Sequence, residues 1–100
     1  MADYQILYWH DIPLQVRVRQ GRERSSKELS PRFQIAVDNA SMESGLTGTD
    51  AYLELLQWTA PQAREGSVDE VLGQVVAELE GKFPKIDWKK TVESLQQNRE

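Results

Sequence analysis

The chain has 100 residues, 39% hydrophobic and 28% charged, which is the balance of one folded, soluble domain. Lys and Arg number 12 against 16 Asp and Glu, and the net charge of −4 argues against a polycation suited to duplex DNA. With no cysteine and one histidine, disulfides, thiolate metal sites, cysteine nucleophiles and any self-contained two-histidine site are excluded.

The N-terminal residues MADYQILYWHD carry acid but no Lys or Arg, and they contain no long apolar stretch. We therefore expect no signal peptide. No window approaches the length of about 18 consecutive apolar residues that a membrane span needs. These features predict a cytoplasmic protein that makes no membrane contact, and the small size suggests a bacterial one.

Two N-terminal segments have the patterns of strands. Residues 4–10 are aromatic and aliphatic, as is typical of a strand. Residues 14–20 alternate apolar and polar side chains, which predicts a half-buried strand. Residues 11–13 contain a proline that interrupts the pattern, so the two segments are predicted to form a β-hairpin.

A hairpin loop at residues 11–13 would fix the register of the two strands. It places Tyr8 opposite Val16 and Ile6 opposite Val18. A shift by one residue would invert the faces of the sheet.

Residues 21–28 are polar, charged and aperiodic, which predicts a loop. A helix is then predicted over residues 31–44, because Ser30 can cap it and proline fits the first helical position. Gly45 is a natural left-handed residue at its end.

Residues 51–59 are ambiguous. Tyr, Leu and Trp in a run of this length favour a third strand, whereas the spacing of Leu53 and Leu56 also suits a short helix. We adopt the strand.

The last third of the chain is helical in pattern. Ser67 is a capping residue, and an apolar stripe at helical spacing follows it as far as Phe83, where Pro84 ends the helix. Asp87 is a candidate cap for a short C-terminal helix.

These elements predict a two-layer α+β domain in the order β-β-α-β-α over residues 1–86, followed by a helical tail over residues 87–100. A right-handed crossover places strand one between strands two and three, which gives a mixed three-stranded sheet of order 2-1-3. Both main helices would then cover one face of the sheet.

The uncovered face is the candidate binding surface. In the predicted register it carries Trp9, Arg17 and Arg19 together with Gln5, Leu7 and Gln15. An apolar patch beside arginines is typical of interaction sites, where Arg and Trp are enriched. The candidate partner-binding residues are Trp9, Arg17, Arg19, Arg22 and Arg24.

Charge is distributed unevenly along the chain. The segment from Arg17 to Arg32 holds six basic residues and two acidic ones, a net charge of +4, so the rest of the chain carries −8. Five of the six basic residues are arginines, whose planar guanidinium suits paired contacts with carboxylate or phosphate. A solvated, charged loop would give the same pattern.

No catalytic constellation is found in the sequence. His10 is most simply a strand-end or turn residue, and Asp11 beside it points to the other face of a strand. Residues 45–50 contain two glycines but lack the lysine of a phosphate-binding loop. We therefore expect no enzyme activity, no cofactor and no metal.

Several short motifs between residues 8 and 58 resemble a known family. They are Tyr8-Trp9 followed by Asp11-Ile12-Pro13, the arginine-rich run to Arg24, Arg32-Phe33-Gln34, and residues 48–53 with the sequence GTDAYL. Together they are similar to the small bacterial "virulence factor" family, the domain found in conserved virulence factor C. The resemblance implies a bacterial accessory domain and brings no assigned active site or ligand.

Two functions from different classes follow from these features. The first is a non-catalytic protein-interaction domain that uses the arginine-bearing face and the basic loop. The alternative is single-stranded RNA binding on the same face, where aromatic side chains could stack on bases. The acidic balance and the lack of the usual RNA-binding sheet motif weigh against RNA. We expect a monomer or a weak homodimer formed through an edge strand.

Overall fold

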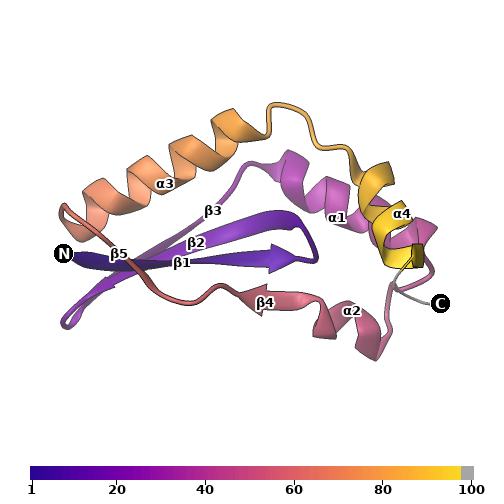
Figure 1. The fold of residues 1–100 in the computed structure, drawn as a ribbon, viewed down its shortest axis with the longest axis horizontal. Coiled ribbons are helices and arrows are strands. Elements are labelled where there is room, and N and C mark those ends of the chain that lie inside the picture. Colours follow the sequence, from indigo (N-terminus) through magenta and orange to yellow (C-terminus); the bar gives the residue numbers. More distant parts are fainter. Residues whose placement is uncertain (98–100) are drawn as a thin grey trace.

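A computed structural model describes residues 1–97 of the chain. It is an α+β domain, as predicted (Figure 1). The strands are β1 (Ala2–Trp9), β2 (Ile12–Gln20), β3 (Glu23–Glu28), β4 (Leu56–Trp58) and β5 (Gln62–Arg64). The helices are α1 (Pro31–Glu43), α2 (Asp50–Glu54), α3 (Val68–Lys82) and α4 (Trp88–Gln97).

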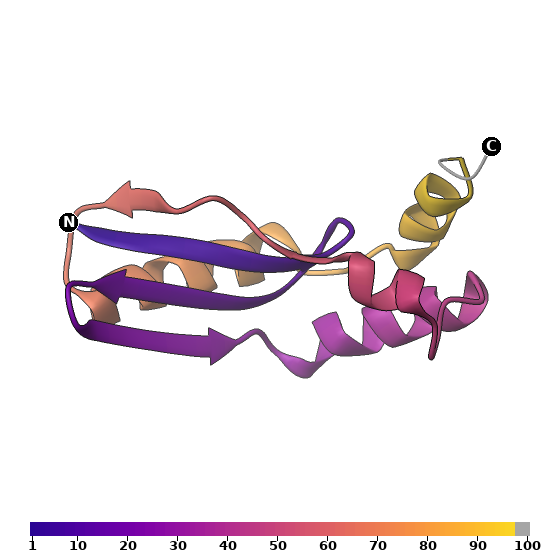
Figure 2. The ribbon, with the colours of Figure 1, turned by 90° about the horizontal axis from the view of Figure 1, so that it is seen from below.

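All five strands form one antiparallel sheet (Figure 2). Its order is β3-β2-β1-β4, and β5 pairs with the other end of β1. The predicted mixed sheet of three strands in the order 2-1-3 differs from this in detail. Residues 23–28, predicted as a loop, add β3 at one edge, and residues 62–64 add β5. The segment β2-β1-β4 does keep the predicted order.

The β1–β2 hairpin is tighter than predicted. Ile6 lies opposite Val16 and Tyr4 opposite Val18, two residues away from the predicted register. The chain turns at His10 and Asp11, where His10 adopts a left-handed φ of 55°. β2 therefore begins at Ile12, and a β-bulge takes up the difference by leaving Leu14 without an opposite residue. Because the shift is by two residues, the faces of the strands are preserved.

Helix α3 covers one face of the sheet, where it packs on β2 and β3 (Figure 1). Ser67 caps it, as predicted, by accepting a hydrogen bond from the backbone of Glu70. Its apolar stripe meets Val16 and Val18 of β2 in the core, and the buried members of the stripe are Val68, Val71, Leu72, Val75, Val76 and Leu79. Burial of this stripe is what holds the helix on the sheet.

The other helices lie past the end of the hairpin rather than on the sheet face (Figure 2). Helix α1 ends at Glu43, and the predicted left-handed Gly45, whose φ is 73°, follows its capping residue Ser44; the helix packs against α4. The prediction that both main helices cover one face is therefore wrong for α1. Its burial of Phe33, Val37 and Ala40 instead builds a second part of the core together with α4.

The C-terminal segment is joined to this core. Val92 and Leu95 of α4 are buried in the same apolar cluster as the sheet residues. Residues 98–100 of the predicted tail lie outside the described residues. None of the helices described in residues 1–97 is both long and apolar enough to cross a membrane.

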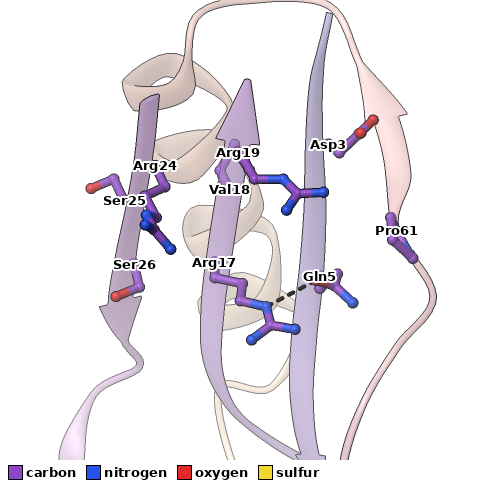
Figure 3. A pocket seen from close by; sticks show the side chains of 9 residues that line it. All are labelled: Asp3, Gln5, Arg17, Val18, Arg19, Arg24, Ser25, Ser26 and Pro61. Atoms are coloured by element: carbon purple, nitrogen blue, oxygen red, sulfur yellow. Dashed lines mark hydrogen bonds between the residues drawn. The ribbon is translucent and has the colours of Figure 1, made fainter. Parts of the chain in front are cut away.

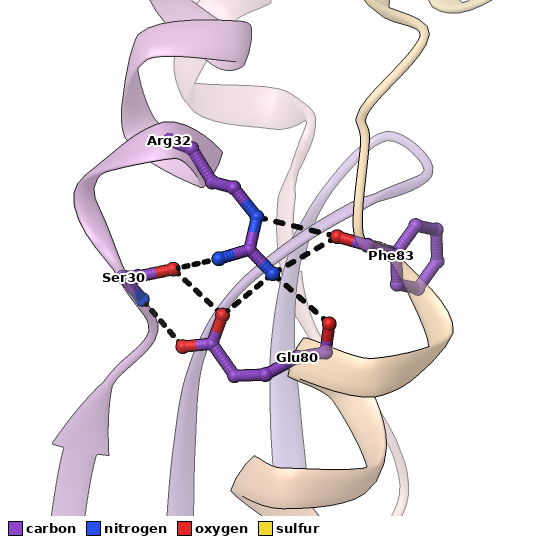
Figure 4. A network of polar contacts seen from close by, with 4 residues as sticks. All are labelled: Ser30, Arg32, Glu80 and Phe83. Carbon is purple, nitrogen blue, oxygen red and sulfur yellow. Dashed lines mark hydrogen bonds and ion pairs between the residues drawn. The ribbon is translucent and has the colours of Figure 1, made fainter.

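A polar network fastens the start of α1 to the end of α3 (Figure 4). The Arg32 guanidinium donates to the carbonyl oxygens of Phe83 and Glu80, and it pairs with the Glu80 carboxylate at 2.8 Å. That carboxylate also accepts hydrogen bonds from the backbone and hydroxyl of Ser30. The pKa of the Glu80 carboxyl lies below its ordinary value of 4.5, first because Ser30 donates to it, with Arg32 adding to the effect.

Candidate functional site

The face of the sheet turned away from α3 carries the candidate site, which we call the open face. It consists of Asp3, Gln5 and Leu7 of β1, Gln15, Arg17 and Arg19 of β2, and Arg24, Ser26 and Glu28 of β3. These residues share a face because cross-strand partners project to the same side of a sheet. A shallow groove of about 380 Å³ runs over the part of this face that carries the arginines, Asp3 and Gln5, and Pro61 borders it (Figure 3).

Arg17 lies on an aromatic ring at the centre of the open face. Its guanidinium carbon is 3.9 Å from the ring centre of Trp58, and its Nε donates to Gln5 Oε1 at 2.9 Å (Figure 3). The Gln5 amide in turn donates to the backbone oxygen of Thr59 at 2.8 Å. This chain of contacts holds Arg17 in one orientation while its side chain stays exposed.

The arginines of the open face lie on neighbouring strands, and none of them takes part in an ion pair described in residues 1–97. Arg19 lies opposite Arg24 on one side and opposite Asp3 on the other. Within residues 1–97, the ion pairs join Arg32 to Glu80 and Arg64 to Glu78, so none of them neutralises an open-face arginine. Two like charges directly opposite each other destabilise a sheet, and an anion bound between them would relieve that cost.

The structure brings together three of the five predicted site residues. Arg17, Arg19 and Arg24 line the groove. Arg22 lies in the turn between β2 and β3, at the exposed end of this hairpin.

Placing Trp9 on the open face is wrong, because its side chain is 0% exposed. Its indole Nε1 donates to the backbone oxygen of Tyr52 at 3.1 Å, and the two rings are 5.6 Å apart. Tyr52 belongs to α2, which forms where the sequence favoured a strand. Thr49 starts this helix by accepting a hydrogen bond from the backbone of Tyr52.

Sequence reasoning missed Trp58 as a component of the open face. Its residue type is typical of a core or sheet-edge aromatic, whereas β4 places it opposite Leu7 and under Arg17. No short-range signal links Trp58 to Arg17; only the antiparallel pairing of β4 with β1 does so. Trp58 therefore takes the position on this face that the sequence assigned to Trp9.

The single histidine lies at the junction of the hairpin with α4. His10 Nε2 is 2.9 Å from Ser94 Oγ, and the Asp11 carboxylate accepts a hydrogen bond from the Thr91 hydroxyl at 2.7 Å. Asp11 thus bonds to Thr91, so it does not orient the histidine ring as in a catalytic triad. Both contacts tie the turn to the helix.

Acidic and metal-binding side chains are dispersed over the rest of the surface. The part of the chain described by the structure contains no group of three or more His, Cys, Asp or Glu that could hold a metal ion. On β1, burial raises the pKa of the Tyr8 phenol, with a smaller contribution from Tyr4. The Arg64 guanidinium lowers the pKa of Glu78 by hydrogen bonding to its carboxylate. Neither of these pKa shifts involves a residue of the open face.

Comparison with known proteins gives one match. The family model described as "Virulence factor" matches residues 7–92, which include the arginines of the open face but not Asp3 or Gln5. No curated protein and no solved structure matches the chain.

Proposed function

The chain belongs to the virulence factor family, whose name describes a phenotype rather than a chemistry, and we propose that this domain is a non-catalytic protein-interaction module. Its open face would bind an acidic segment of a partner protein. The partner's carboxylates would contact the guanidinium groups of Arg17, Arg19 and Arg24. The basic turn that carries Arg22 would extend the same surface.

The observation that carries this proposal is the presence of three arginines, none of them in an ion pair described in residues 1–97, against one acidic residue (Asp3) in one solvent-exposed groove. Carboxylates match the planar fork of arginine and can accept two parallel hydrogen bonds from it. Arg17 is also pre-oriented by Trp58 and Gln5, which lowers the entropy cost of ordering it on binding. The volume of about 380 Å³ is enough for a few side chains of an extended segment.

The geometry favours a protein ligand over single-stranded RNA. Sheet-based RNA binders need aromatic rings whose faces are free to stack on bases. The exposed side of Trp58 is occupied by the Arg17 guanidinium, and Trp9 is buried. The net charge of −4 also works against the long-range attraction of a polyanion.

Binding of model ligands tests the proposal directly. Labelled oligoglutamate and oligouridylate of equal charge would be titrated with the protein at low salt, and their fluorescence anisotropy would be followed. We expect binding of oligoglutamate, and a loss of about tenfold or more in affinity for the double variant Arg17→Glu/Arg19→Glu. Tighter binding of oligouridylate would instead support the RNA alternative.

The matched control is Lys89→Glu/Lys90→Glu. It makes the same change in net charge on exposed residues of α4, away from the sheet. If both double variants lose affinity equally, net charge governs binding and the open face has no special role. A pull-down from bacterial lysate with the same set of variants would identify the natural partner as the protein lost only with the β2 variant.

A further inference from the structure

Strand β3 forms a free edge of the sheet (Figure 2). It pairs with β2 on one side, and apart from Ser25 all of its residues are exposed. Gln20 and Glu23 pair on either side of the two-residue turn that joins β2 to β3. In such a two-residue hairpin the closing pair is hydrogen bonded. Glu23, Ser25 and Lys27 therefore direct their backbone groups toward β2.

The alternate residues of β3 direct their backbone groups outward. These are Arg24, Ser26 and Glu28, and no backbone hydrogen bond within residues 1–97 beyond the β2 ladder uses them. The next residue, Leu29, donates inward to the Leu14 oxygen at 2.9 Å, which agrees with this alternation. A row of unpaired backbone donors and acceptors is a template for another strand.

We propose that β3 pairs antiparallel with β3 of a second copy of this chain, about a two-fold axis through Ser25. The residues that direct their backbone outward must face each other in such a pair, which leaves only registers that shift in steps of two residues. In the register centred on Ser25, Arg24 lies opposite Ser26 of the second copy. Such a dimer is isologous, as most homodimers are.

Charge complementarity selects this register. Glu23 then faces Lys27 of the second copy, and Arg22, in the turn that precedes β3, lies next to Glu28 of the second copy. The two-fold axis repeats the Glu23–Lys27 pair, so two oppositely charged pairs form across the ladder and stabilise it, with an Arg22 beside a Glu28 at each end. The sequence of β3 is therefore complementary to itself when read in the reverse direction.

The neighbouring permitted registers are poorer. A shift in one direction puts Arg24 opposite Arg24 of the second copy. A shift in the other direction pairs Arg24 with Glu28 in both halves of the dimer, but it leaves Glu23 and Lys27 without charged partners and separates Arg22 from Glu28. Charged residues on an edge strand can also act simply to prevent association. To prevent association, an edge strand would need charges of one sign or a residue such as proline that blocks pairing. β3 contains no proline, and its balanced charges occupy complementary positions.

Sedimentation velocity over a wide range of protein concentration tests the dimer. We expect reversible self-association of the wild type that weakens as salt is added. Glu23→Lys and Lys27→Glu each turn two attractive pairs into repulsive ones, so each should raise the dissociation constant by about tenfold or more. Neither residue takes part in the ion pairs described in residues 1–97, and circular dichroism would confirm that the variants fold.

The decisive arm is the mixture of the two single variants. In the heterodimer, the lysine introduced by Glu23→Lys on one chain faces the glutamate introduced by Lys27→Glu on the other. At the other end of the interface the native Lys27 of the first chain faces the native Glu23 of the second. Both pairs are attractive, and the heterodimer has the same net charge as the wild-type dimer. We therefore expect the mixture to recover association, as should the double variant Glu23→Lys/Lys27→Glu.

Matched controls are Glu43→Lys and Lys85→Glu, which make the same changes in charge on exposed residues away from β3. Each of these controls should associate like the wild type. A loss of association in them equal to that of the β3 variants would mean that net charge, rather than the proposed register, governs the dimer.

Two further results would overturn the proposal. One is a wild type that stays monomeric at all concentrations; the other is association that the single variants leave unchanged or the mixture fails to restore. The dimer does not depend on the proposed function, because its interface uses the backbone edge of β3 with Glu23 and Lys27, whereas the ligand would contact the guanidinium groups of the open face. Loss of oligoglutamate binding and loss of dimerisation are separately measurable.

Discussion

Replacing Arg32 by alanine should destabilise the fold markedly, because this side chain joins α1 to the end of α3. It donates to Phe83 O at 2.9 and 3.3 Å, to Glu80 O at 3.0 Å and to Ser30 Oγ at 2.6 Å, and it pairs with the Glu80 carboxylate at 2.8 Å. At the end of α3 the Phe83 backbone N–H donates to Leu79 O. The carbonyl oxygens of Glu80 and Phe83 come after this last helical hydrogen bond, and Arg32 donates to both of them.

The expected loss of unfolding free energy in Arg32→Ala follows from the number of these contacts and from the exposure of the Arg32 side chain. The Arg32 side chain is 39% exposed, so water replaces part of each bond, and each is worth only about 0.5 kcal/mol. Five contacts then give about 2.5 kcal/mol, which lowers the melting temperature of a domain this size by roughly 10–20 °C. Urea unfolding followed by circular dichroism measures the free energy directly.

Two further variants separate the explanation from a general charge effect. Arg32→Lys keeps the charge but lacks the planar fork, so it should recover less than half of the loss. Arg22→Ala removes an arginine from an exposed turn and should change stability by less than about 0.5 kcal/mol. A wild-type melting temperature for either Arg32 variant would refute this account of the network.

Two other predictions concern the core and the pH dependence. Trp9→Ala should lower the free energy of unfolding, measured in urea, by about 4 kcal/mol, because the ring is 0% exposed. Trp58→Ala should lower it by less than half as much. Equal losses would contradict the assignment of Trp58 to the open face. The pKa of Glu80 is depressed from 4.5, so its contribution to stability is present above that pH and is lost as pH falls through the lower, folded-state value. Glu80→Gln should therefore be less stable than the wild type at neutral pH, and the free energies of unfolding of the two should converge as pH falls below the lowered pKa of Glu80 in the folded protein; a difference that stays constant with pH would be evidence against this role of Glu80.

The sequence predicts best those elements whose pattern reports burial. The apolar stripe of α3 and its Ser67 cap are confirmed because an amphipathic helix on a sheet must show that spacing. The alternation of Val16 and Val18 with arginines likewise identifies the two faces of β2. Arg17 and Arg19 are therefore predicted on the correct face even though the predicted hairpin register is wrong.

The failures occur where a strand carries no apolar pattern or where long-range contacts decide the structure. β3 buries no apolar side chain, so its residues have no periodicity, and pairing with the adjacent β2 alone makes it a strand. Trp9 continues the alternation of β1, but the helix α2 covers it. That cover comes from a segment far along the chain, which single-sequence patterns do not connect to β1.

The proposal that the open face binds an acidic segment can be tested by mapping the backbone amide shifts of the ¹⁵N-labelled protein during titration with oligoglutamate. We expect the largest changes on the open face, at Gln5, Arg17, Arg19 and Arg24, together with a change in the indole signal of Trp58. Changes concentrated on the lysines of residues 82–90, or no changes at concentrations where wild-type binding is detected by anisotropy, would contradict it.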